Sequence, residues 1–150
     1  MDMRILPLSS LLLFGLAAAA PPVQPPHRLT SDQARRLALL VAGHDHIDTA
    51  DTHIEFNSMD MNAAFIRGFS SFIVIRESAS QEPDETLRRY AVSQRTGSVW
   101  EMTLCTRYRF PELVHLQHEL LGKNADASDD EIAMEKRRLG CDVNNPRPAM

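Results

Sequence analysis

The chain contains few cysteines, few glycines and few tryptophans. Its 150 residues include two cysteines, six glycines and one tryptophan. It also lacks a long run of Lys or Arg, and its formal net charge is −4. Nucleic acids and anionic membrane surfaces are bound through clustered cations, so we expect neither as a partner. The length suits one ordinary domain, and we do not expect a multidomain enzyme.

Catalytic signatures are absent from the sequence as well. It has no G-x-S-x-G turn, no glycine-rich phosphate loop and no H-E-x-x-H pair. His115 and His118 lie three residues apart on a predicted helix beside Glu112 and Glu119. We interpret these side chains as the solvent-exposed face of that helix, because no nucleophile or oxyanion donor accompanies them. The sequence therefore predicts a protein that is not an enzyme.

The first twenty residues have the pattern of a secretory signal peptide. Arg4 precedes an apolar stretch from Ile5 to Leu16, which is followed by the four alanines Ala17 to Ala20. The stretch is too short to span a bilayer, and small residues follow it where a signal peptidase cuts. We predict cleavage after Ala19 and no stable membrane insertion afterwards, with an uncleaved anchor as the alternative. The predicted location is secreted or periplasmic.

The composition divides residues 20–150 into a tether, a domain and a tail. Residues 20–28 are rich in proline and predict an extended tether, because proline cannot donate backbone hydrogen bonds. Residues 142–150 contain two prolines and two asparagines but little apolar surface, which predicts a disordered tail. A single domain is expected over residues 29–141.

Hydrophobic periodicity predicts the elements of this domain. A first amphipathic helix begins after the capping-box pair Thr30 and Gln33 and ends at Gly43. Strands are predicted around Ile54 and over residues 69–76, 87–94 and 98–105, with a polar loop at 77–86. The last two strands form the clearest hairpin, because Gly97 sits where a short turn needs positive φ.

Two helices are predicted after the strands, one from Pro111 to Gly122 and one from Ser128 to Gly140. Consecutive strands joined by loops favour an antiparallel meander, and the first helix needs a sheet face to cover its apolar side. The predicted class is α+β, with an N-terminal helix, a four-stranded antiparallel meander and two C-terminal helices.

The two cysteines flank the last part of the domain. Cys105 ends the last predicted strand, and Cys141 follows the last helix. In an exported chain a single pair favours a disulfide, which would hold the thin third helix against the sheet. Two buried free thiols are the alternative. A redox role is not expected, because the pair lacks C-x-x-C spacing.

Histidines and carboxylates concentrate between the first helix and the first strand. His44, His46 and His53, with Asp48 or Met59 completing the shell, are a candidate zinc or copper site. The segment from His44 to Met61 would then make the chain an exported metal carrier. We favour the interpretation that these side chains are solvated surface and helix end, because no fixed ligand spacing accompanies them. No cofactor is therefore predicted, and the metal carrier remains the alternative.

One segment carries a family resemblance. Residues from Arg89 to Trp100 resemble the strand, Thr-Gly turn and strand of PepSY-type modules, which are small exported α+β domains linked to peptidase propeptides. The resemblance covers about a tenth of the chain. It implies a noncatalytic binding or inhibitory role and transfers no functional residue.

These observations lead to one functional hypothesis. A compact exported domain on a proline-rich tether, without a catalytic set, fits a small noncatalytic module that binds a protein or peptide partner outside the cytoplasm.

Overall fold

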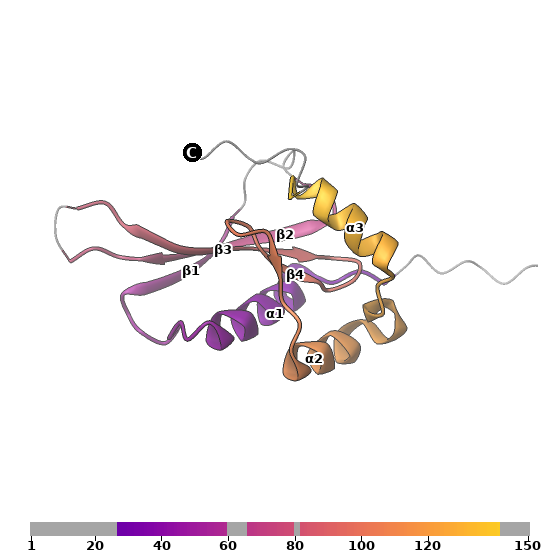
Figure 1. Ribbon diagram of the computed structural model, residues 1–150. Helices are drawn as coiled ribbons and strands as arrows, with labels where there is room; N and C mark the ends of the chain where they lie inside the picture. Colours follow the sequence, from indigo (N-terminus) through magenta and orange to yellow (C-terminus); the bar gives the residue numbers. More distant parts are fainter. Residues whose placement is uncertain (1–26, 60–65, 80–81, 142–150) are drawn as a thin grey trace, which may run out of the picture.

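The computed structural model describes residues 27–59, 66–79 and 82–141 (Figure 1). The predicted signal segment 1–19, most of the tether 20–28 and the tail 142–150 lie outside the described residues. The elements follow in the order α1 (Ser31–His44), β1 (Ile54–Ser58), β2 (Phe69–Arg76), β3 (Glu85–Ser93), β4 (Val99–Glu101), β5 (Thr106–Arg107), α2 (Pro111–Leu121), the 3-10 turn η1 (Gly122–Ala125) and α3 (Asp129–Arg138).

All strands belong to one antiparallel sheet in the order β1-β2-β3-β4-β5. The predicted α+β class and the order of helix, strands and two helices are confirmed. The sheet has five described strands rather than the four predicted, because β5 adds a short strand after β4. No described helix is long and apolar enough to cross a membrane.

The helix boundaries agree with the capping signals of the sequence. Thr30 accepts from the backbone N–H of Gln33, and the Gln33 side chain accepts in return from the backbone N–H of Thr30. Ser128 and Glu131 form the same capping box at α3, and Pro111 is the first residue of α2. These contacts satisfy N–H groups that would otherwise lack partners at a helix start.

One face of the sheet is closed by α1 and α2, which lie on the same side of it (Figure 1). The side chains that meet there come from α1, α2 and the sheet, and Tyr90, Phe72 and Leu37 are each less than 2% exposed. The main core cluster contains Leu29, Ala34, Leu37, Ala38, Val41, Ala42, Phe56, Phe72, Val74, Tyr90, Val92, Val99, Leu113 and Leu121.

The other face is covered by α3 at the β3–β4 end (Figure 1). A smaller cluster forms there from Ala91, Trp100, Leu139 and Cys141. A disulfide joins Cys105 to Cys141 across 36 residues of chain, as the sequence predicts. It ties the end of α3 to the turn that follows β4.

The prediction was wrong about where the strands of the hairpin end. β4 stops at Glu101 instead of continuing to Cys105, and Leu104 is 74% exposed rather than on a sheet face. The Glu101 side chain accepts a hydrogen bond from the backbone N–H of Leu104, and Cys105 has a φ of 55°. A side chain that caps its own turn reverses the chain here, and β5 then returns along β4. The polar loop is also shorter than predicted, because β3 begins at Glu85.

Candidate functional site

The second face of the sheet has a part that the core clusters do not include. Successive side chains of a strand point to opposite faces, so Ile73 and Ile75 point away from the buried Phe72 and Val74. Both isoleucines are half-buried, and neither belongs to or packs against a core cluster. We define the open face as Glu55, Asn57, Ser71, Ile73, Ile75 and Arg89.

Strand register sets the layout of the open face. Ile73 is paired with Asn57 of β1 on one side and with Arg89 of β3 on the other. Ile75 is paired with Glu55, which accepts a hydrogen bond of 2.8 Å from the Asn57 side-chain amide. The open face thus has an apolar centre with a carboxylate at one side and a guanidinium at the other.

A pair of carboxyl groups stands at the β1 edge of the open face. A side-chain hydrogen bond with Glu55, followed by the negative charge of Glu55, raises the pKa of Glu77 above its usual value. The negative charge of Asp84 adds to that shift, and the charge of His53 opposes it. Glu77 is exposed. This edge therefore carries a carboxyl pair that holds a proton more tightly than an isolated glutamate does.

The structure does not gather the predicted metal ligands. The His44 ring stacks on Phe110 with 4.0 Å between ring centres, and His46 is exposed with a φ of 59°. His53 lies next to the sheet edge, where its backbone carbonyl accepts from the Glu77 N–H. The described residues contain no group of three or more His, Cys, Asp or Glu side chains placed to hold a metal ion. Met61 lies outside the described residues.

Asp45 has a structural role that sequence reasoning missed. Its carboxylate accepts hydrogen bonds from the hydroxyl groups of Tyr90 and Tyr108 and lies 3.6 Å from the Arg88 side chain. Burial, and then the hydrogen bond to Asp45, raises the pKa of both tyrosines. Asp45 therefore fixes the end of α1 to β3 and to the residue after β5. No local sequence pattern indicates this role, because the three partners lie 43 to 63 residues away.

The two histidines of α2 lie on its exposed side, as the sequence predicts. His118 is 3.2 Å from Asp126, and both histidines line a shallow hollow of about 730 Å³ with Phe110 and Val114. This set lacks a buried acid, base or nucleophile, so the hollow has no catalytic arrangement among the described residues.

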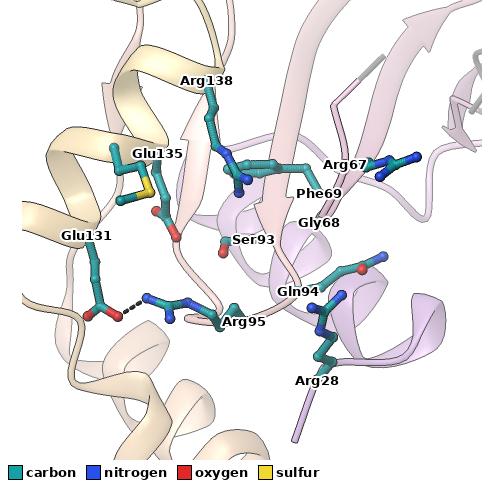
Figure 2. A pocket seen from close by; sticks show the side chains of 11 residues that line it. Arg28, Arg67, Gly68, Phe69, Ser93, Gln94, Arg95, Glu131, Glu135 and Arg138 are labelled. Carbon is teal, nitrogen blue, oxygen red and sulfur yellow. Dashed lines mark ion pairs between the residues drawn. The ribbon is translucent and has the colours of Figure 1, made fainter. Parts of the chain in front are cut away.

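A second cavity, of about 530 Å³, lies between α3, the β3–β4 turn and the residues that precede α1 and β2 (Figure 2). The sequence analysis did not single this cavity out. Four arginines from separate segments line it, so no local pattern marks it. We call it the arginine pocket, and it is lined by Arg28, Arg67, Gly68, Phe69, Ser93, Gln94, Arg95, Glu131, Met134, Glu135 and Arg138.

Comparisons with known proteins found one family model and one solved structure that are similar to parts of this chain. The model of a family described as "Effector immunity protein Tgi2PP" matches residues 46–88. A solved chain from "Structure of a type VI secretion system effector-immunity complex from Pseudomonas protegens" is similar at a TM-score of 0.65 and 22% identity, over 77% of this chain and 91% of that chain. This similarity shows a shared fold. No curated protein sequence matches the chain.

The comparisons correct the family resemblance inferred from the hairpin. The matching family and the similar structure are of the effector-immunity type, not PepSY-type modules. The Thr-Gly turn was misleading because any tight hairpin favours glycine at positive φ, and Gly97 has a φ of 72°.

Proposed function

We propose that this chain is an exported, noncatalytic immunity protein that binds a type VI effector protein through its open face. The observation that carries the proposal is the position of the family match. Residues 46–88 contain β1, β2 and the first part of β3, and they include every residue of the open face except Arg89.

The chemistry of the open face supports a protein partner. Protein interfaces have an apolar centre that excludes water and a polar rim that sets orientation. Ile73 and Ile75 supply such a centre, and Glu55 and Arg89 supply rim charges of opposite sign. A small substrate would need a concave site with convergent polar groups, and neither of the two cavities described above is lined by a residue of the open face.

The proposed site of action is outside the cytoplasm. The predicted signal peptide over residues 1–19 supports export, and the disulfide between Cys105 and Cys141 is the kind of bond that persists in an oxidising compartment. In this proposal the tether 20–28 and the tail 142–150 flank a single binding domain over residues 29–141.

The test is binding to candidate type VI effectors from the same genome, measured by calorimetry. Ile73→Asp places a charge in the centre of the open face, and we expect it to raise the Kd by at least about thirtyfold, or about 2 kcal/mol. Val114→Asp is the matched control, because Val114 is also half-buried, packs against neither core cluster and lies on α2 behind the opposite face. Equal weakening by both variants would place the interface elsewhere.

A cell-protection assay tests whether export is needed in addition to binding of the effector. Cells that export the effector should survive when they also produce the full chain. A chain lacking residues 1–19 should still bind the purified effector but no longer protect. Protection by the truncated chain would contradict the proposed export.

A further inference from the structure

The arginine pocket is locally positive in a chain whose formal net charge is −4. Arg95 forms an ion pair with Glu131, which leaves three other arginines at the cavity wall. Among the described residues, none forms an ion pair with Arg28, Arg67 or Arg138. These guanidinium groups are available to an anion that enters the cavity.

The second acidic side chain of the pocket is already engaged. Glu135 is 6% exposed, and its two carboxylate oxygens accept from the Thr96 hydroxyl at 2.6 Å and from the Trp100 indole N–H at 3.2 Å. Its charge also acts on Arg107, where it opposes the lowering of the pKa that burial causes. Glu135 therefore fixes the wall of the pocket. Among the described residues it forms no ion pair with Arg28, Arg67 or Arg138.

The other residues that line the pocket indicate which further groups a ligand should have. Phe69 brings apolar surface to the same cavity as the guanidinium groups (Figure 2). Met134 also lines this cavity and is 50% exposed. The Gln94 side chain donates to the Ser70 hydroxyl at 3.3 Å, and no described residue donates to its amide oxygen. A suitable ligand thus combines an oxyanion, an apolar group and an N–H donor.

We infer that the arginine pocket binds the carboxylate of a short peptide segment whose neighbouring apolar side chain lies against Phe69 and Met134. Guanidinium groups bind carboxylates through paired, charge-assisted hydrogen bonds. The peptide N–H provides the donor that the Gln94 oxygen accepts, and a simple phosphate ester has none. The cavity volume lies in the range of sites for small ligands. This inference goes beyond the proposed function, because a short peptide can occupy the pocket without an effector.

The experiment is calorimetric titration of the intact mature protein at low salt with acetyl-leucyl-glutamate, its neutral analogue acetyl-leucyl-glutamine amide, and phenyl phosphate. We expect the dicarboxylate peptide to bind at about millimolar Kd or tighter, and the neutral analogue to bind at least about tenfold more weakly. Phenyl phosphate should bind more weakly than the dicarboxylate, because it cannot donate to Gln94.

A pair of neighbouring arginines on α3 provides the variants. Arg138→Gln removes a lining guanidinium and should weaken binding of the dicarboxylate by at least about tenfold. Arg137→Gln removes an exposed charge of the same helix that does not line the cavity, and should change the Kd by less than about twofold. Both residues are exposed, so both variants should fold.

Three results would overturn the inference. Absence of measurable binding, or equal binding of the neutral analogue, would show that the arginines do not select a carboxylate. Equal losses in the two arginine variants would show only general attraction to a basic helix end. Tighter binding of phenyl phosphate than of the dicarboxylate would assign the pocket to a phosphate-bearing ligand instead of a peptide.

Discussion

The two faces of the sheet are made by the same strands but differ in what covers them. On one face, alternate residues such as Phe72 and Val74 are fully buried beneath α1. On the other, their neighbours Ile73 and Ile75 are half-buried and belong to no core cluster. The difference teaches that apolar residues of one strand can serve two purposes. The first face supplies stability, and the second leaves apolar surface to which we propose that a partner binds.

The same contrast appears in the way the faces are secured. The α1 face relies on a large core cluster, whereas the α3 face has four buried members and a disulfide. α3 has few apolar residues of its own, and the residue that it buries is the charged Glu135. A covalent link is useful where little apolar surface is available to hold a helix.

The largest expected effect comes from truncating one residue on each face of β2. Phe72→Ala leaves a cavity in the main cluster and should lower the free energy of unfolding by about 3–5 kcal/mol. Ile73→Ala should lower it by less than about 1.5 kcal/mol, because that side chain is only half-buried. Denaturant unfolding followed by circular dichroism measures both values. Similar losses would mean that the open face is part of the core.

Removal of the disulfide should have an intermediate effect. The double variant Cys105→Ala, Cys141→Ala should lose about 3–4 kcal/mol in the chain-entropy model, for a closed loop spanning 36 residues of separation. Reducing agent should lower the midpoint of unfolding of the wild type and leave that of the double variant unchanged. Hydrogen exchange should quicken most in α3. Uniform quickening across α1 would contradict a local role for the bond.

The smallest expected effect is on the pH response of the open face. The raised pKa of Glu77 means that the folded state holds its proton more tightly than the unfolded chain does. The resulting contribution to stability is complete below the unfolded pKa and is lost as the pH rises through the folded pKa. Glu55→Gln removes the negative charge that repels Glu77 and replaces its carboxyl hydrogen-bond partner by an amide. An NMR titration of this variant should therefore show a lower pKa for Glu77. Glu112→Gln on α2 should leave that titration unchanged.

The local elements were predictable because their signals are short in range. The capping pairs at Thr30 and Ser128, the proline at the start of α2 and the run of Phe, Ile and Val in β2 are each signals contained within a few residues. The end of β4 was not predictable from alternation, since Met102 and Leu104 continue the pattern. There the Glu101 side chain accepts a hydrogen bond from the backbone N–H of Leu104, so the chain turns instead of continuing the strand.

The candidate sites required long-range information. The arginine pocket combines residues from before α1 to the end of α3, and no spacing in the sequence connects Arg28 with Arg138. The open face depends on which residues of β2 the helices leave uncovered, and alternation alone does not distinguish the two faces. The histidines are a different case, because they are close in sequence, yet the described residues contain no group of three or more His, Cys, Asp or Glu side chains placed to hold a metal ion.

The sequence alone determined the α+β class, the helix boundaries and the pairing of the two cysteines, because periodicity, caps and a single possible pair leave few alternatives. Tertiary structure decided which face of the sheet is closed, how Asp45 joins α1 to two tyrosines and where the arginines meet. These features arise when segments tens of residues apart come together. The energy of such contacts depends on burial and geometry, which a linear pattern does not specify.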